Sequence, residues 1–395
     1  MLIEIHILQN HAPSNLNRDD TGSPKECTFG GVRRARISSQ CLKRSIRRSE
    51  IFQDELDGKL GMRTRRLPEK VREKLIEKGL SEEMAKIGAE KASGFGNKAG
   101  SPQKPNSDGK YDTAQTMFLT QADIDAVVDV IFAAASEAKD AKAFDKVEAK
   151  TLQANAQSKG YRPITVDVAL FGRMTTSEAF RDVEACTQVA HAISTHKVDH
   201  EYDYFTAVDD LQGLSEDEED AGADMIGEVE YNASCYYKYF SIDTHALCRN
   251  LSGEANGRKD LSPDEKAEVE KTAQQTVDAF LRAAIMTTPT GKQNSFAAHQ
   301  LPSLVLVEVR PQRTPVSYAN AFVKPAWAGK GDDLVQSSLT QLQAHVAALT
   351  GGFNLKSDSR LSLAPEHPEY KIEGVDSVKD LDSLCATIKG SIHYA

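Results

Sequence analysis

The pattern of apolar and polar residues predicts four strands. In residues 3–7 isoleucine takes every second position and alternates with Glu4 and His6, which is typical of a strand with one buried face. Residues 164–168 repeat this alternation with two valines and an isoleucine. Residues 229–242 are rich in Val, Tyr and Phe, and residues 304–309 are apolar, which predicts two more strands.

Helical spacing of apolar residues predicts helices around these strands. Ser38 or Ser39 is a suitable N-cap for a helix that ends near Ser49, in which Leu42 and Ile46 face a core. Residues 122–157 predict two Ala-rich helices, and residues 180–196 predict another. A Ser-x-x-Glu capping box opens a helix at residue 262, and a last helix is expected near residues 333–349.

The order of these elements is that of a ferredoxin-like α+β fold. With two insertions set aside, residues 50–160 and residues 197–228, the chain reads strand, helix, strand, strand, helix, strand. This fold hosts many functions and includes the RNA-recognition domains. Their Gly-aromatic-Gly-aromatic strand signature is absent here, so we do not expect RNA to stack on the sheet face.

The composition is that of an ordinary globular protein. The 395 residues are 40% hydrophobic and 27% charged, with a net charge of −10, which excludes a disordered chain, a collagen and a uniformly basic coat. The N-terminus has no basic lead-in, and no apolar run reaches the roughly 18 residues that span a bilayer. The six cysteines form no Cys-x-x-Cys pair. We expect a reduced, cytoplasmic protein with no membrane segment.

Charge is strongly segregated along the chain. Arg33–Arg48 contains seven basic residues and no acidic one, whereas residues 199–230 contain thirteen acidic residues and no Lys or Arg. A second basic stretch covers residues 59–78. Residues 91–110 are rich in Gly, Pro and Lys, which predicts a mobile loop with four projecting lysines, Lys91, Lys98, Lys104 and Lys110. Each segment is either a solvated surface or a contact surface for a charged partner.

Residues 14–48 have the chemistry of a phosphate-binding surface. Residues 15–18 supply hydrogen-bond donors beside a turn, and residues 38–40 open a helix whose N-terminal amides attract an anion. Lys43 and Arg44 lie alongside on the same helix. Such contacts bind phosphate whatever the base sequence. The alternative is a basic helix face in water.

This stretch also resembles a known family, the CasC-type backbone subunits of the CRISPR type I-E Cascade surveillance complex. The matching strings lie in the family's order along most of the chain: HAPSNLNRDD (His11–Asp20), FGGVRRARISSQCLKRSIR (Phe29–Arg47), FGRM (Phe171–Met174), AHAISTHKV (Ala190–Val198), YFTAVDD (Tyr204–Asp210) and, more weakly, SYANAF (Ser317–Phe322).

The resemblance implies a modified RNA-recognition palm with helical fingers and a thumb hairpin. Several copies would polymerise head-to-tail along a guide RNA (crRNA), beside other Cascade subunits, and leave bases free to pair with target DNA. One nucleotide would be displaced at regular intervals. The implied boundaries are 1–49, 161–196 and 229–395 for the palm, the last with a C-terminal extension, 50–160 for the fingers and 197–228 for the thumb.

The family's RNA-contact positions map onto named residues of this chain. The palm positions are Arg18, Lys25, Ser38, Gln40, Lys43, Arg44 and Arg47. The wedge and thumb positions are Met174, Tyr204, Phe205 and Thr206, where Tyr204 replaces the Trp that is usual in the family. Because fingers in this family lie toward the duplex, the second basic stretch and the four lysines of residues 91–110 become candidate contacts to DNA.

Other kinds of site compete with this interpretation. The chain has no phosphate-cradling GxxxxGK[ST] loop and no HExxH, so we expect no enzyme activity and no cofactor. The alternative is a metal-dependent ribonuclease of the same fold, which would use Asp19 and Asp20. His196 and His200 are either metal ligands or ordinary polar contacts. The aromatic run Tyr236–Phe240 either stacks on bases or fills the two faces of the sheet.

A head-to-tail repeat needs two different complementary surfaces on each subunit. The acidic thumb flanks would meet a basic surface of the next copy, so reversal of Glu216, Asp217 and Glu218 to Lys is expected to impair assembly.

Overall fold

The computed structural model describes residues 1–158, 162–207, 225–258, 260–329, 331 and 333–393. The chain divides into two compact units. The sheet unit comprises Met1–Phe52, Gln188–Ile242 and Val277–Ser391, and the helical unit comprises Gln53–Thr187, Asp243–Thr276 and Ile392–Ala395. Most of the acidic block, with Glu216, Asp217 and Glu218, lies outside the described residues.

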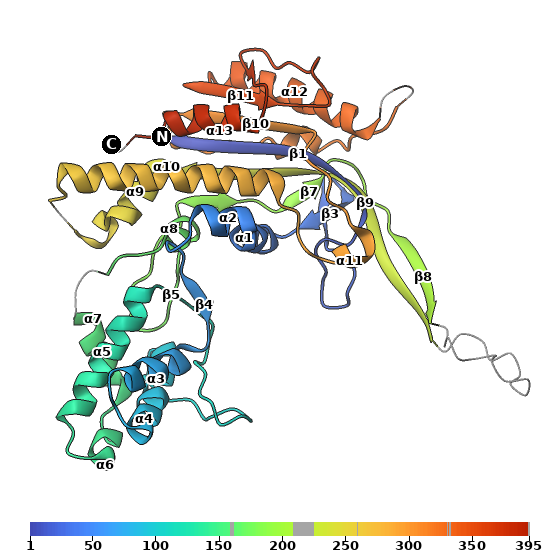
Figure 1. The fold of residues 1–395 in the computed structure, drawn as a ribbon. Helices are drawn as coiled ribbons and strands as arrows, with labels where there is room; N and C mark the ends of the chain where they lie inside the picture. The colour runs from blue at the N-terminus through green and yellow to red at the C-terminus, as the bar shows by residue number, and fades with distance from the viewer. Residues whose placement is uncertain (159–161, 208–224, 259, 330, 332, 394–395) are drawn as a thin grey trace, which may run out of the picture. The chain divides into compact units, whose positions relative to one another are not determined.

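The sheet unit is built on ten strands (Figure 1). They are β1 (Leu2–Ser14), β2 (Glu26–Phe29), β3 (Val32–Ile37), β6 (Thr187–Val189), β7 (Ala192–Ser194), β8 (Glu201–Ala207), β9 (Met225–Asp243), β10 (Leu304–Arg310), β11 (Ser359–Leu363) and β12 (Asp376–Ser377). Eight of them lie side by side in the order β12-β11-β10-β1-β9-β7-β3-β2, and β6 and β8 also pair with β9. The β11–β12 pair is parallel, whereas β10 pairs with β1 and β11 in the antiparallel sense.

Helices of this unit pack on the sheet or begin at its edges. They are α1 (Ser39–Arg48), α11 (Gln293–Phe296), η3 (Ala319–Phe322), α12 (Leu334–Gly352), α13 (Leu381–Gly390) and the C-terminal part of α10 (Pro263–Met286). Leu339, Leu342 and Val346 of α12 join strand residues such as Leu8 and Leu306 in one buried cluster. The strands predicted at 229–242 and 304–309, and the helices predicted after residues 38, 262 and 333, are confirmed.

β1 is buried on both faces, so the prediction of a half-buried strand is wrong. Glu4 and His6 are fully buried, and other buried groups pair with them. Arg310 Nε lies 2.6 Å from Glu4 Oε2, and the Tyr239 hydroxyl donates to Glu4 Oε1 at 2.6 Å. His6 Nδ1 lies 2.8 Å from the Tyr237 hydroxyl. A charged residue that is buried and paired alternates with apolar residues in the sequence just as an exposed charged residue does, so the pattern alone does not separate the two.

The aromatic run on β9 fills the sheet and is not a base-stacking surface. Tyr236, Tyr237, Tyr239 and Phe240 are all buried. Tyr237 packs on Phe322, and Phe240 packs edge-on against Phe280. Of the two interpretations from sequence, the structural one is confirmed.

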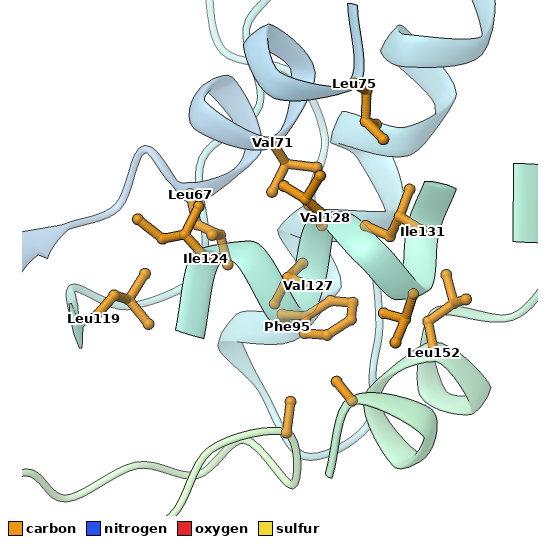
Figure 2. Close-up of a cluster of buried hydrophobic side chains, with 14 of the residues drawn as sticks. Leu67, Val71, Leu75, Phe95, Leu119, Ile124, Val127, Val128, Ile131 and Leu152 are labelled. Atoms are coloured by element: carbon orange, nitrogen blue, oxygen red, sulfur yellow. The ribbon is translucent and has the colours of Figure 1, made fainter. Parts of the chain in front are cut away.

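The helical unit has its own core (Figure 2). Its elements are β4 (Met62–Thr64), α3 (Leu67–Glu77), α4 (Glu82–Ser93), η1 (Gly94–Gly96), β5 (Met117–Leu119), α5 (Gln121–Glu137), α6 (Ala141–Asp145), α7 (Ala149–Ser158), α8 (Val166–Phe171), α9 (Thr244–Ser252), η2 (Glu254–Asn256), the second half of α2 (Glu50–Glu55) and the first part of α10. Val71, Phe95 and Ile131 are among the fully buried residues at its centre (Figure 2). In the described ranges we find no helix that combines the length and the apolarity needed to cross a membrane.

Three expectations about local structure are wrong. Residues 164–168 do not form a strand, because residues 166–171 form α8 with apolar residues buried all around it. Residues 180–196 contain the short strands β6 and β7 in place of a helix, since β9 offers them backbone partners. Residues 122–157 form three helices, not two. A five-residue alternation is too short to separate a strand from a buried helix turn.

Candidate nucleic-acid interface

The loop before β2 is fixed against the start of α1 by one asparagine. The side-chain oxygen of Asn17 accepts from the Ser38 amide at 2.8 Å, and its backbone oxygen accepts from the Lys25 amide at 2.8 Å. Arg18 follows directly and forms an isolated bridge with Pro24. The fold therefore brings Arg18 and Lys25 to the N-terminal end of α1, as the phosphate-binding interpretation requires.

Helix α1 presents one polar face. Ser38 caps the helix by accepting from the Cys41 amide at 3.3 Å, and Leu42 and Ile46 are buried. The four predicted contact residues on the helix recur at i, i+3, i+4 and i+7, which places them on one face: Gln40, Lys43, Arg44 and Arg47. Gln40 and Arg44 are exposed, and Lys43 and Arg47 are half-buried.

Four cations of this surface have no acidic partner among the described residues. Within the described ranges, none of Arg18, Lys25, Lys43 and Arg44 forms an ion pair. Partial burial lowers the pKa of Lys43 from its usual value. Because no described carboxylate neutralises these four cations, an external anion can pair with them.

One residue that sequence reasoning missed, His191, lies at the same helix end. The His191 Nδ1 atom lies 3.2 Å from Nη1 of Arg36 and 3.3 Å from the Ser39 amide. Burial, together with the nearby Arg36 and Lys25, lowers the pKa of His191. A neutral His191 can accept from both donors and orient them. The only signal in the sequence was its place in the AHAISTHKV string.

One arginine of the basic cluster is structural. Arg34 is fully buried and donates to the backbone oxygens of Phe322 at 2.7 Å and Ser194 at 3.2 Å. Gly30 lies so close to Val323 that an added Cβ would be 2.0 Å from its carbonyl oxygen. Of the seven bases in Arg33–Arg48, Arg34 is therefore buried and structural, and the other six are half-buried or exposed.

Strands β8 and β9 form a two-stranded hairpin that extends from the sheet (Figure 1). Its register pairs Tyr204 with Glu228 and Phe205 with Gly227. Because successive strand residues point to opposite faces, Tyr204 and Phe205 lie on opposite sides of the ribbon. The Phe205 ring covers Gly227, where an added Cβ would be 2.5 Å from the ring. Thr206 is exposed and shares the face of Tyr204.

The base of this hairpin is held by a histidine between two carboxylates. His200 contacts Glu26 of β2 through Nε2 and Glu230 of β9 through Nδ1. His196 contacts the Lys197 carbonyl and the Cys235 amide. The two histidines therefore make separate polar contacts, which favours that interpretation over a shared metal site. No cluster of three metal-ligating side chains occurs among the described residues.

Asp19 has the geometry of a turn residue. Its Oδ1 atom accepts from the amides of Thr21 at 2.9 Å and Ser23 at 3.0 Å, and from the Thr21 hydroxyl at 2.8 Å. The hydrogen bond from the Thr21 side chain is the main cause of its lowered pKa. This carboxylate stabilises the loop that carries Arg18.

Met174 belongs to the helical unit and is 93% exposed. Arg173, the residue before it, is buried against Asp123, with Nη1 and Oδ2 at 2.5 Å. The exposed Met174 side chain thus directly follows a residue, Arg173, that a buried ion pair holds in place.

The four lysines expected on one mobile loop have different environments. Lys91 is buried in α4 and donates to the carbonyl oxygens of Asp145 at 2.9 Å and Val147 at 2.7 Å, so it is not a DNA-contact residue. Lys110 forms an ion pair with Glu69 at 2.8 Å. Lys98 and Lys104 are exposed and, in the described chain, unpaired. The prediction of a four-lysine grip is therefore wrong, because long-range folding supplies partners to two of them.

The second basic stretch is also largely neutralised. Four bases on or beside α3 pair with acids: Lys70 with Glu73, Arg72 with Glu82, Lys74 with Asp125 and Lys78 with Asp129. Arg63, Arg65 and Arg66, which precede α3, are exposed and have no ion pair within the described residues. They are the part of the second basic stretch, residues 59–78, that stays available to a charged partner among the described residues.

Comparisons with known proteins agree with this architecture. A family model described as CT1975-like protein matches residues 3–387. A solved chain titled "CRISPR RNA-guided surveillance complex, pre-nicking" is 26% identical, with a TM-score of 0.79 over 99% of this chain and 100% of that chain. A second, titled "CRISPR RNA-guided surveillance complex", is 23% identical, with a TM-score of 0.69 over 98% of this chain and 100% of that chain, and supports the fold. No curated protein matches the sequence.

The match to the family model covers nearly the whole chain, and the resemblance identified from the motifs is confirmed at the level of CRISPR surveillance-complex subunits. The mixed α+β architecture is likewise confirmed. The chain belongs to the CT1975-like protein family.

Proposed function

We propose that this chain is a non-catalytic, guide-RNA-binding subunit that polymerises head-to-tail as the backbone of a CRISPR Cascade complex of type I-E. The observation that carries the proposal is the set of unmatched cations around α1. Arg18, Lys25, Lys43 and Arg44 have no acidic partner in the described chain, whereas the bases of α3 do. Such a surface suits a sugar-phosphate backbone and does not read base sequence.

The order of the central strands supports a ferredoxin-like palm. β10, β1, β9 and β7 are neighbours in that order. If β1, β7, β9 and β10 are numbered one to four along the chain, the order 4-1-3-2 results, with α1 and α10 in the two crossovers. In this arrangement β7 takes the place that the sequence had assigned to residues 164–168.

The proposed mechanism divides the work between two surfaces. Phosphates lie along the polar face of α1, near Ser38 and the exposed Gln40 side chain. The hairpin supplies aromatic side chains, Tyr204 on one face and Phe205 on the other, that contact bases or a neighbouring copy. Bases that are not held by these contacts remain free to pair with target DNA. The crRNA, further copies of the chain and other Cascade subunits are the proposed partners, in the cytoplasm.

Purification of the assembled complex under native conditions tests the proposal directly. We expect the protein to retain RNA of uniform length, with protection from nuclease at a regular spacing. A chain that retains no RNA, or RNA of random lengths, contradicts the proposal. Incubation with complementary RNA and Mg²⁺ tests the non-catalytic assignment, because regularly spaced cuts in that RNA would identify a ribonuclease.

We also propose that Arg63, Arg65 and Arg66, with Lys98 and Lys104, contact target DNA. The support is that they are exposed cations of the helical unit without an ion pair in the described chain. Substitution of the three arginines by Ala is expected to weaken duplex binding and leave RNA retention unchanged. Lys78→Ala is a suitable control, since its charge is already matched by Asp129 at 3.1 Å. Loss of RNA retention without loss of DNA binding contradicts the assignment.

A further inference from the structure

We propose that Asp182 and the Asp123–Arg173 ion pair are positioning residues that hold Met174 in place for contact with guide RNA. The inference rests on the proposed function and concerns the helical unit alone. Met174 is the most exposed of the large hydrophobic residues in the described chain, at 93%. Its neighbours in sequence are fixed by contacts that leave the Met174 side chain itself outside.

Arg173 anchors the residue before the methionine. Its buried guanidinium donates through Nη1 to Asp123 Oδ2 at 2.5 Å and to the Phe118 carbonyl at 3.2 Å. Its backbone pairs with Val183 in both directions, at 2.9 and 2.8 Å. Breaking a buried ion pair of this kind is strongly unfavourable. The Cα position of Arg173 is therefore set by the core of the unit.

Asp123 connects this anchor to helix α5. It is buried, and its carboxylate accepts from the Thr120 amide at 3.0 Å in a reciprocal capping box. Arg162 also reaches the same carboxylate, at 3.5 Å. Both guanidinium groups lie near the Phe180 ring. The positive charges of Arg162 and Arg173 are thus turned inward to Asp123 and away from solvent.

Residues on either side of Arg173 and Met174 also restrain the backbone. Gly172 has φ +75°, and an added Cβ would lie 2.9 Å from the Val183 carbonyl oxygen, so only glycine fits. On the other side the Thr175 amide donates to Asp182 Oδ1 at 2.7 Å. Met174 lies between the anchored Arg173 and Thr175, so its backbone is held from both sides while its side chain remains exposed.

This arrangement suits insertion of an apolar side chain beside a nucleobase. A thioether makes favourable contacts with aromatic rings, and apolar side chains can enter between base steps. A backbone that is already fixed loses little conformational entropy on binding, which increases affinity. An exposed methionine whose sequence neighbours are held in place therefore gains binding free energy when it leaves water and contacts a base.

The test uses the assembled complex with guide RNAs that carry 2-aminopurine, which fluoresces more strongly when unstacked, at successive spacer positions. In the unmodified complex we expect strong fluorescence at regularly spaced, displaced positions. Met174→Ala and Asp182→Ala are expected to lose this signal to the same level and to retain RNA. Asp182→Asn is expected to restore it, because the amide oxygen still accepts from Thr175. Glu184→Ala removes an exposed carboxylate of the same segment and is the control.

The outcomes separate this inference from the proposed function. If Asp182→Ala keeps the full signal while Met174→Ala loses it, the positioning role is refuted. If Met174→Ala itself keeps the signal, contact with RNA is refuted, although the complex still holds its guide. If the unmodified chain retains no RNA, the proposed function fails instead. Asp123→Asn is expected to lose the signal as well, and its thermal unfolding shows whether the unit remains folded.

Discussion

Removal of two cations from α1 gives the sharpest test of how the chain holds RNA. Lys43 and Arg44 share the polar face of the helix, and neither has an acidic partner in the described chain. Among the described residues, neither has to give up an ion pair to bind a phosphate. Each is therefore expected to neutralise one phosphate and to displace the counterions held by the RNA at that phosphate.

The magnitude follows from the two cations that the substitutions remove. Each phosphate neutralised on a single strand adds about −0.7 to the slope of log K against log salt. The Lys43→Ala, Arg44→Ala double variant should therefore make the slope about 1.4 less negative. If the two proteins bind RNA equally at 1 M salt, the double variant binds about 25-fold more weakly than the unmodified chain at 0.1 M salt. This difference corresponds to about 2 kcal/mol of binding free energy.

Fluorescence anisotropy with short unstructured RNAs, measured from 50 to 400 mM KCl, gives both quantities. Lys78→Ala is the matched control, because Asp129 already neutralises that lysine and the slope should not change. Two RNAs of unrelated sequence should lose affinity equally. An unchanged slope in the double variant, or a weakening that depends on the RNA sequence, would refute phosphate binding at α1.

Three further predictions concern other parts of the chain. Burial lowers the pKa of Lys238 to about 8, below the unfolded value of 10.5, so Lys238→Met should raise the free energy of unfolding by at most about 3 kcal/mol at pH 7. This gain should shrink as the pH rises from 8 toward 10.5, where the folded chain no longer carries the buried charge, and urea unfolding at pH 7 and pH 9.5 measures it. Lys91→Ala should lower the melting temperature, since its two carbonyl partners lose their donor, whereas Lys98→Ala should not; equal melting temperatures would contradict the assigned burial. Tyr204→Ala and Phe205→Ala should have additive effects on RNA affinity, because the side chains lie on opposite faces, and a coupling energy above about 0.5 kcal/mol in a double-mutant cycle would show that they act together.

Local sequence signals predicted much of the candidate site. The Ser38 cap, the buried pair Leu42 and Ile46, and the spacing of the basic residues on α1 are all properties of a few adjacent residues. Such patterns are set by helix geometry and survive in any fold. The roles of these residues in RNA binding stay predictions. The same local reasoning failed at residues 164–168, where the alternation matched a strand but neighbouring segments bury the residues as a helix.

Charge was harder to interpret than periodicity. Lys91 and Lys98 are equivalent in the sequence, yet one is buried beneath backbone carbonyls 54 and 56 residues away, while the other is exposed. Asp125 and Asp129 neutralise bases on α3 from 51 residues away. Whether a basic residue is available to a ligand depends on acids that are distant in sequence.

The amino-acid sequence by itself determined the helix caps, the basic face of α1 and the family to which the chain belongs, since these depend on short-range geometry and on motifs. Only the tertiary structure decided which cations remain free, which strand lies beside β9 and which side of the hairpin each aromatic ring occupies. The physical reason is that burial, ion pairing and strand register arise from contacts between segments far apart in the chain, and a linear pattern does not record those contacts.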